Sequence, residues 1–510
     1  MPTDIKEIQK SILSGGSFAL VGSAAFAAMK YLQRLVLARV LSPDQYGIFS
    51  LGLMIFMVTV SVGLLGIQRG VNRFVPYFRA EGEEGKVKGT LLGGSILALI
   101  SGVVFAVGLF ILARFLSLSV FEETSLLNVI RVFVFAVPAM ILLRVLIRGL
   151  EGFKKINYSM GLKTGEIALR LLGIIVVSLA GFELLAVPVV FIVSTWLVVI
   201  MGYWLLREKV FPLFNPDIPA HFELGKLFHY SWPLFLTGIL NLVVGWTDTF
   251  MIGFFSDSAD VGVYNVALPT SQMIILLLQS ISVIFLPLAT EAFSRGEEGK
   301  LREIFNISYR WVFLATLPVY LFMVLFAQPI IVLVFGAEYA AGAGALVVLS
   351  SGFFLASLSG PTQKLFNSLG RTRLVLGLTS SAALVNVALN LVLVPRLGII
   401  GAAIATATSL GVGSMLNLVF LYRVSDIFPL GIFYLRPVIV GVASVGGLYL
   451  IEKMAPVSIP YYLVPLEVII AFSLYGLGLY LTNALKEEDR QIIVTVYNAV
   501  REKVKGGGSF

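Results

Sequence analysis

Residues 17–41 read SFALVGSAAFAAMKYLQRLVLARVL, and this stretch decides the class of fold. It is long and apolar enough to cross a bilayer, which takes roughly 20 residues at 1.5 Å each. Lys30 and Arg34 lie inside it, four residues apart and therefore on one face of a helix. A cation near the middle of a spanning helix costs about 2.5–3.5 kcal/mol on insertion scales, so the pair predicts a hydrated face that binds anions. The alternative is that Arg34, together with Arg39, extends to the outer membrane surface.

The sequence that follows this stretch has a second copy further along the chain. YGIF at residues 46–49 aligns with VGVY at residues 261–264, an offset of 215 residues. GEEGK at residues 82–86 recurs unchanged at residues 296–300, an offset of 214 residues. Offsets that drift so little indicate a duplicated unit. Each copy holds six predicted spans, an even number, so the two copies share one orientation and are related by an axis along the membrane normal.

The composition is that of an integral membrane protein. Of the 510 residues, 58% are hydrophobic and 13% are charged, whereas soluble domains are about 25% charged. The chain has no cysteine and two histidines, which excludes disulfides and leaves no His/Cys ligand cluster to propose. The sequence offers neither a His-bearing triad nor a phosphate-binding loop after a strand, so we expect a transporter rather than an enzyme, without a metal or organic cofactor.

We predict an all-α membrane protein with about fourteen transmembrane helices. Two six-helix bundles, related by a pseudo-two-fold axis along the membrane normal, are followed by a C-terminal helix pair. The N-terminal bundle takes residues 1–222, the C-terminal bundle 223–430, the extra pair 431–485, and a cytoplasmic amphipathic tail 486–510. The predicted spans are 13–37, 46–67, 90–113, 125–147, 158–180, 184–206, 229–253, 262–289, 306–328, 342–366, 373–394, 400–422, 433–453 and 461–484.

Lysine and arginine are concentrated in the loops that follow even-numbered spans. Positively charged loops stay on the cytoplasmic side, so we expect both termini in the cytoplasm and a multi-pass location in the cytoplasmic (plasma) membrane. The same asymmetry accounts for most of the net charge of +8, so no nucleic-acid partner is expected. These residues are Arg69, Arg73, Arg79, Lys86, Lys88, Lys154, Lys155, Lys163, Arg207, Lys209, Lys226, Arg295, Lys300, Arg302, Arg371, Arg373 and Arg423.

Further ionisable groups at membrane depth are candidates for the site. Glu166 and Arg170 are four residues apart in the fifth span, with Arg170 near the midplane. In one interpretation they are a structural ion pair whose charges cancel. In the other, Arg170 binds a ligand, and Glu166 adjusts the charge of Arg170 or exchanges a proton. Arg144 and Arg148, with Lys364 of the tenth span, either line the cytoplasmic entrance or anchor the inner ends of their helices. We include Arg144 among the candidates for substrate binding.

Asp248 is the only acid well inside the first helix of the second copy. The repeat aligns it with the residue before Arg34. Helices related by an axis along the membrane normal face each other across the cavity, so Asp248 is a candidate gate residue that meets Lys30 or Arg34 near the outer mouth and closes it. The alternative is a carboxylate bonded locally, through Thr247 and Thr249.

Short motifs link the chain to a known family. They are LSPDQYG at residues 41–47, RFVP at 73–76 and FNSLG at 366–370. In this order, with two six-helix copies and a terminal pair, the sequence resembles the polysaccharide transporter family (Wzx-type oligosaccharide flippases) of the multidrug/oligosaccharidyl-lipid/polysaccharide exporter (MOP) superfamily. The resemblance implies alternating access through a cationic central cavity. It also implies that Lys30, Arg34 and Arg170 meet phosphate or acidic sugar.

The leading hypothesis is therefore a flippase for polyprenyl-(pyro)phosphate-linked oligosaccharide. The bilayer and this lipid are the expected partners, glycan-assembly enzymes are further candidates, and a monomer is expected. A proton or sodium gradient is a candidate driving force, with Glu166 or Asp248 as the coupling acid. One alternative is an ion-coupled multidrug or cation exporter of the same superfamily, although those exporters usually carry a carboxylate in the first helix where this chain has cations. A remote alternative is a membrane glycan polymerase or ligase, which would need a sizeable outer loop.

Overall fold

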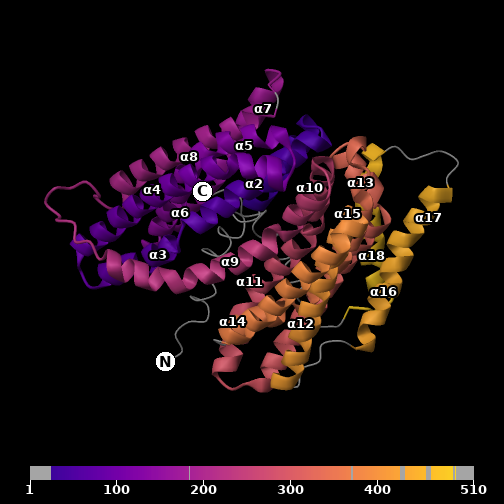
Figure 1. Ribbon diagram of the computed structural model, residues 1–510. Helices are drawn as coiled ribbons and strands as arrows, with labels where there is room; N and C mark the ends of the chain where they lie inside the picture. Colours follow the sequence, from indigo (N-terminus) through magenta and orange to yellow (C-terminus); the bar gives the residue numbers. More distant parts are fainter. Residues whose placement is uncertain are drawn as a thin grey trace, which may run out of the picture. The chain divides into compact units, whose positions relative to one another are not determined.

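The computed structural model describes residues 25–182, 184–368, 371–425, 431–454, 461–485 and 489 (Figure 1). Residues 25–40 form the first described helix, and short 3₁₀ or π segments continue several of the later ones. The α-helices that follow are α2 (Pro43–Gly63), α3 (Ile67–Ala80), α4 (Glu84–Phe115), α5 (Thr124–Phe133), α6 (Val137–Gly152), α7 (Ile156–Leu179), α8 (Ala186–Leu205), α9 (Leu224–Phe255), α10 (Ser258–Ser271), α11 (Met273–Ser294), α12 (Glu298–Leu325), α13 (Ala327–Val334), α14 (Gly342–Ser368), α15 (Thr372–Ser425), α16 (Leu435–Gly441), α17 (Gly447–Met454) and α18 (Val464–Leu481).

Within these residues, nine helices are long and apolar enough to cross a membrane. One of them, in α15, runs over 51 residues and would be about 77 Å long at 1.5 Å per residue. That is more than twice the ~30 Å hydrocarbon core, and Gly398, with φ of 53°, breaks the helix. The break lies between the predicted spans 373–394 and 400–422. The prediction of an all-α membrane protein is confirmed, whereas the total of fourteen spans and the symmetry of two bundles stay predictions.

Contacts divide the chain into two compact units. Unit 1 takes its described residues from Met1–Thr270, Val334–Ala345 and Thr379–Ser409, and unit 2 takes them from Ser271–Leu333, Leu346–Leu378 and Leu410–Phe510. This division follows contacts, whereas the predicted boundaries at 222, 430 and 485 follow the sequence repeat, so those boundaries stay a prediction. The predicted tail 486–510, apart from Asp489, and the beginning of the predicted first span lie outside the described residues.

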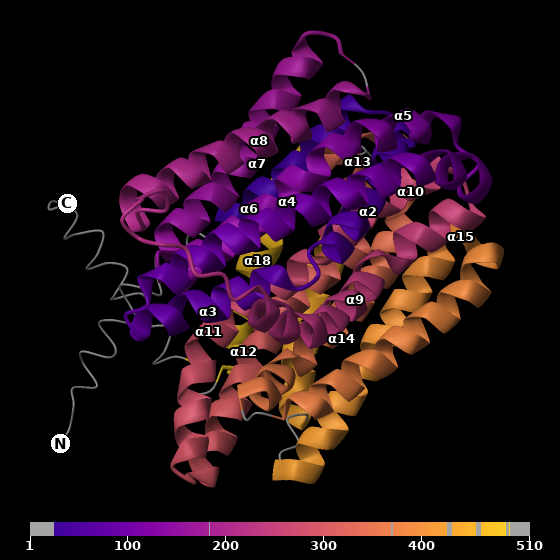
Figure 2. The ribbon, with the colours of Figure 1, turned by 60° about the vertical axis from the view of Figure 1, so that its left-hand side comes forward.

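Unit 1 is built around α2, which is buried over most of its length. Its start is fixed by a capping box, in which the Ser42 side chain accepts a hydrogen bond from the Gln45 amide and the Gln45 side chain accepts one from the Ser42 amide. Figures 1 and 2 show α4 and α6 running alongside this helix. Its aromatic side chains stack against those of α5 and α8, as in the Phe56–Phe133 pair with ring centroids 5.1 Å apart.

The duplicated GEEGK motif folds into the same turn in both copies. Gly82 and Gly296 have φ of 73° and 69°, a left-handed conformation that favours glycine. Each glycine is followed by a glutamate that precedes a long helix, α4 in one copy and α12 in the other. Each turn also carries an ion pair across three residues, Lys86–Glu83 at 2.7 Å and Lys300–Glu297 at 3.2 Å. The repeat read from the sequence therefore extends to local backbone geometry.

A reciprocal glycine contact joins α2 to α10 within unit 1. A Cβ atom added to Gly47 would overlap the carbonyl oxygen of Ser258, and one added to Gly262 would overlap the carbonyl oxygen of Pro43. Pro43 and Ser258 are 215 residues apart in the sequence, as are Gly47 and Gly262. Residues that contact each other in this crosswise way are what a local two-fold axis requires. The two helices approach so closely because neither has a side chain at the crossing point.

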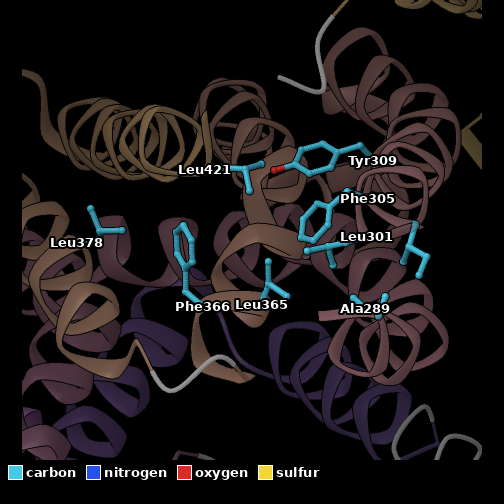
Figure 3. Packing of buried hydrophobic residues seen from close by; sticks show 10 residues of the cluster. Ala289, Leu301, Phe305, Tyr309, Leu365, Phe366, Leu378 and Leu421 are labelled. Atoms are coloured by element: carbon cyan, nitrogen blue, oxygen red, sulfur yellow. The ribbon is translucent and has the colours of Figure 1, made fainter. Parts of the chain in front are cut away.

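Unit 2 has its own core, in which helices α11, α12, α14 and α15 meet (Figure 3). Phe305 and Phe366 are almost completely buried there, and the Tyr309 hydroxyl is hydrogen-bonded to that of Thr362. Elsewhere in this unit, Nε and Nη2 of Arg310 donate to one carboxylate oxygen of Asp489 at 3.0 and 2.8 Å. A buried arginine in a spanning helix is thereby neutralised by an acid from the end of the chain.

The glycine crossing predicts the effect of a single methyl group. We expect Gly47→Ala and Gly262→Ala each to lower the stability by about 1–3 kcal/mol, because the added carbon must push two backbones apart. Gly161→Ala is the matched control, since Gly161 lies in the helix α7 and an added Cβ there meets open space. Thermal unfolding in detergent measures the difference. Equal midpoints for the Gly47 and Gly161 variants would contradict the close crossing.

Candidate functional site

A cavity of about 560 Å³ lies within unit 1 and gathers most of the ionisable residues singled out in the sequence. Its walls come mainly from the helix of residues 25–40 and from α2, α6 and α7, with single residues from α3, α8, α9 and α10 and from the turn after α2. We call it the basic cavity. Its charged lining residues are Lys30, Arg34, Arg144, Arg148, Lys163, Glu166 and Arg170.

Helical spacing explains why these charges face the same space. Lys30 and Arg34 lie one turn apart on the first described helix, and Arg144 and Arg148 lie one turn apart on α6. Like charges at this spacing destabilise a helix. Arg144 is also close enough to Lys30 for the two charges to repel each other. Such an arrangement persists in a membrane protein only where water or an anion can offset the repulsion.

Arg170 is the most enclosed of these cations. It is 6% exposed, and Nη2 donates to Oε1 of Glu166 and, at 3.0 Å, to Oγ1 of Thr195. Its guanidinium lies 4.3 Å from the centre of the Phe191 ring, a cation–π contact. Its Nε–H is buried and makes no hydrogen bond within the described residues. Glu166 and Arg170 thus form an ion pair in the cavity wall, with one donor of the arginine left over.

A second acid, Glu151, neutralises two further cations of the cavity wall. Glu151, at the end of α6, pairs with Arg148 at 2.6 Å and with Lys163 at 2.7 Å, and it accepts a hydrogen bond from Ser159 at 2.9 Å. From the sequence, Lys163 is one of the charges near the loop after an even-numbered span, and Glu151 is not among the candidate site residues. A role for both residues could have been predicted from their spacing, because Glu151 lies about one helical turn from Arg148 and Lys163 about one turn from Glu166. Their contact depends on how α6 packs on α7, which the sequence does not specify.

Three cations therefore remain without a carboxylate. In the part of the chain that the structure describes, Lys30, Arg34 and Arg144 form no ion pair with an aspartate or glutamate. Lys30 and Arg144 are exposed and Arg34 is half-buried, so their charged groups are accessible from the cavity. The basic cavity consequently carries an excess of positive charge on the wall formed by the first described helix and α6.

Asp248 lies apart from the basic cavity, in a buried polar cluster of unit 1. Its Oδ2 accepts hydrogen bonds from the hydroxyls of Tyr264 and Thr406, each at 2.5 Å. Its Oδ1 accepts from the amide of Asn390 at 2.9 Å and from that of Asn386 at 3.4 Å. The carboxylate thus has four partners, from α10 and α15.

These partners differ from both readings of the sequence. Asp248 is engaged by α10 and α15, whereas the expected gate would join it to Lys30 or Arg34, so that gate stays a prediction. Its bonds also come from distant helices and not from Thr247, which donates to a backbone carbonyl of its own helix at 2.5 Å, or from Thr249. The side chain of Lys364, the remaining candidate, lies outside the described part of the structure.

Helices of spanning length, with a charged cavity among apolar helices, together identify a multi-pass membrane protein. Residues 36–343 match the model of a polysaccharide biosynthesis protein family. The chain belongs to this family, which confirms at the family level the resemblance that the sequence predicted.

The chain is also similar to several known proteins. It is 23% identical to an uncharacterized membrane protein of Methanocaldococcus jannaschii, over 92% of this chain and 96% of that protein. It is 26% identical to the probable low-salt glycan biosynthesis flippase Agl15 of Haloferax volcanii, over 39% of this chain and 42% of that protein. The fold is similar to that of the lipid II flippase MurJ in an inward closed conformation, with a TM-score of 0.71 and 13% identity over 90% of this chain and 97% of that one.

The ion pair between Glu166 and Arg170 predicts that the stability lost on replacing one residue depends on whether the other is present. We expect Glu166→Ala and Arg170→Ala each to destabilise the protein, because either change leaves a largely buried charge without its partner. The double variant should lose less free energy of unfolding than the two single variants together, by a coupling energy of about 1–3 kcal/mol. Unfolding of the four proteins by denaturant measures this cycle. The exposed pair Arg207–Glu208 is the control and should show a coupling close to zero, and additive effects at Glu166 and Arg170 would contradict the pairing.

Proposed function

We propose that the protein translocates polyprenyl-(pyro)phosphate-linked oligosaccharide across the cytoplasmic membrane by alternating access through the basic cavity. The observation that carries the proposal is the wall on which Lys30, Arg34 and Arg144 lie without a carboxylate partner among the described residues. An anionic headgroup entering the cavity would offset their mutual repulsion, which neither water alone nor a neutral sugar does as well. Membership of the polysaccharide biosynthesis protein family and the similarity to a probable glycan biosynthesis flippase support the same substrate class, and a transporter rather than an enzyme.

The residue types suit a phosphate or diphosphate. An arginine offers a planar fork of N–H donors that can bind two phosphate oxygens at once, and a lysine offers a compact charge with three donors. Arg170 takes part differently, because Glu166 already holds it. A headgroup that reaches Arg170 would compete with Glu166 for the guanidinium, so the pair can change partner when substrate binds. Glu166 would then be released as an acid that can exchange a proton.

The topology belongs to the same proposal. In it, residues 1–222 and 223–430 form two bundles that alternate in exposing the cavity to each side, and both termini lie in the cytoplasm. The positive charge of the loops after even-numbered spans supports this orientation. A multidrug or cation exporter is the alternative function, and it is disfavoured because a lipophilic cation entering the basic cavity would add a further positive charge to Lys30, Arg34 and Arg144.

We also propose that movement of H⁺ or Na⁺ at Asp248 drives the cycle. The carboxylate is buried among two hydroxyls and two amides. The side-chain oxygens of Asn386 and Asn390 are buried and accept no hydrogen bond within the described residues. Rotating either amide by half a turn would bring its oxygen toward the carboxylate, and oxygen ligands of this kind suit a hard cation. Protonation of the carboxylate is the other way to offset its burial.

Transport measurements test the role of the cavity. In proteoliposomes that contain a labelled polyprenyl-diphosphate glycan, we expect Lys30→Ala and Arg144→Ala each to slow flipping roughly tenfold or more, since each removes one charged hydrogen bond to the headgroup. Arg170→Ala should slow it as well. Arg207→Ala, which removes an exposed arginine outside the cavity, should behave like the unchanged protein. Equal rates for the cavity variants and this control would overturn the proposal.

Ion gradients test the role of Asp248. We expect flipping by the unchanged protein to accelerate when either a Na⁺ or a proton gradient is imposed, and the gradient that is effective identifies the ion. Asp248→Asn should abolish the acceleration, because an amide can neither bind a proton in this range nor offer a charge to Na⁺. Asp217→Asn changes an exposed loop residue and serves as the control. An acceleration that survives in Asp248→Asn would rule out coupling at this residue.

A further inference from the structure

Unit 1 contains a second, larger cavity of about 730 Å³, with a different chemistry. It is formed by α2, α4 and α9, with single residues from the loop after α4 and from α15. None of its nineteen lining residues is charged, and only Thr59, Trp246 and Thr247 carry a side-chain nitrogen or oxygen. We call it the apolar groove.

The two threonines do not make the apolar groove polar. The hydroxyl of Thr59 donates to the backbone carbonyl of Ile55 at 2.8 Å, and that of Thr247 donates to the carbonyl of Val243 at 2.5 Å. Each hydroxyl hydrogen is therefore used within its own helix. A polar ligand would find few hydrogen-bonding groups on these walls, whereas a hydrocarbon loses nothing by contact with them. The volume lies in the range of pockets that enclose a small organic ligand, about 300–1,000 Å³.

The apolar groove and the basic cavity share a wall. Along α2, Met54, Val58 and Val62 are spaced by one turn and line the apolar groove, whereas Leu53 and Met57 line the basic cavity. Trp246 of α9 lines both. Its ring has an apolar body and one N–H group, which suits the boundary between a hydrated and an oily space.

The apolar groove also opens away from the protein. Leu112 of α4 is 53% exposed, and Val104 and Phe250 are exposed as well, although all three are large apolar residues. A Cβ added to Gly108, between the two exposed residues of α4, would meet no atom within 4 Å. In a membrane protein such an opening faces acyl chains, so a hydrocarbon can enter the apolar groove from the side without crossing water.

We propose that the apolar groove binds a segment of the polyprenyl chain of the substrate while the anionic headgroup occupies the basic cavity. This rests on the function proposed above and adds a second binding site to it. The occupant is the tail of the same molecule, because the two spaces meet at Trp246 and differ in chemistry as the two ends of a prenyl diphosphate differ. α2 then separates head from tail, and the tail stays in an apolar environment while the head crosses.

Narrowing the apolar groove tests the proposal. Gly108→Phe places a ring in the open space, and Gly161→Phe places the same ring in open space on α7, outside both cavities. With a long-chain polyprenyl-diphosphate glycan, Gly108→Phe should slow flipping roughly tenfold relative to Gly161→Phe, because it displaces at least two buried methylene groups of the tail. With a geranyl-diphosphate glycan, whose tail is too short to fill the groove, the two variants should differ much less.

Photo-crosslinking provides a readout that does not depend on transport or on the bulk of the phenylalanine. A photoreactive amino acid is placed at Leu112 in the apolar groove or at Leu172, an equally exposed leucine of α7 outside it. A tail-labelled polyprenyl diphosphate should crosslink at Leu112 well above Leu172, and unlabelled polyprenyl diphosphate should compete with it. Equal labelling at both positions, or competition by phosphatidylglycerol as effective as that by the prenyl diphosphate, would show that the apolar groove holds ordinary membrane lipid.

The two proposals can fail separately. If the unchanged protein flips the glycolipid but Gly108→Phe and Gly161→Phe behave alike with both carriers, the tail site is wrong and the proposed function stands. If the unchanged protein flips neither carrier and Leu112 is not labelled above Leu172, the proposed function and the tail site both fall.

Discussion

The cost of placing cations inside a membrane is the constraint on which the rest of this structure depends. The helix of residues 25–40, α6 and α7 carry positive charges in apolar surroundings, and each of these helices contributes two cations to the lining of one cavity. Glu151 and Glu166 each neutralise part of the cluster, so the charge that remains is localised at Lys30, Arg34 and Arg144. A fold that needed only stability would have replaced these residues by leucine. The anionic headgroup of the proposed substrate would give these charges a partner.

A second feature of the structure is that one helix, α2, separates the basic cavity from the apolar groove. α2 begins at a capping box and crosses α10 where both helices have glycine. Some of its residues line the basic cavity and others line the apolar groove. An amphiphilic substrate has the same division into a charged head and a hydrocarbon tail. A transporter that binds each part in its own compartment keeps the head hydrated without exposing the tail to water.

Much of this could be predicted from the sequence, for identifiable physical reasons. Lys30, Arg34 and Arg170 stand out because a charge within a long apolar run has few explanations, and the i, i+4 spacing places Glu166 beside Arg170. The repeat was visible in GEEGK because a turn that needs a left-handed glycine tolerates little change. Other features depend on tertiary packing, which the local sequence does not specify. Two examples are the bonds of Asp248 to Asn386 and Asn390, across more than a hundred residues, and the pairing of Glu151 with Lys163 of the cavity wall.

The most direct test is to measure whether the basic cavity binds an anionic ligand more tightly than a cationic one. Two amphiphiles with the same prenyl tail, one with a diphosphate head and one with a quaternary ammonium head, can be titrated into the detergent-solubilised protein and their equilibrium affinities compared at low and high salt. The account predicts that the diphosphate binds more tightly and that its affinity falls as salt rises, because the attraction is between exposed charges. Tighter binding of the ammonium compound, or a diphosphate affinity that does not change with salt, would contradict it.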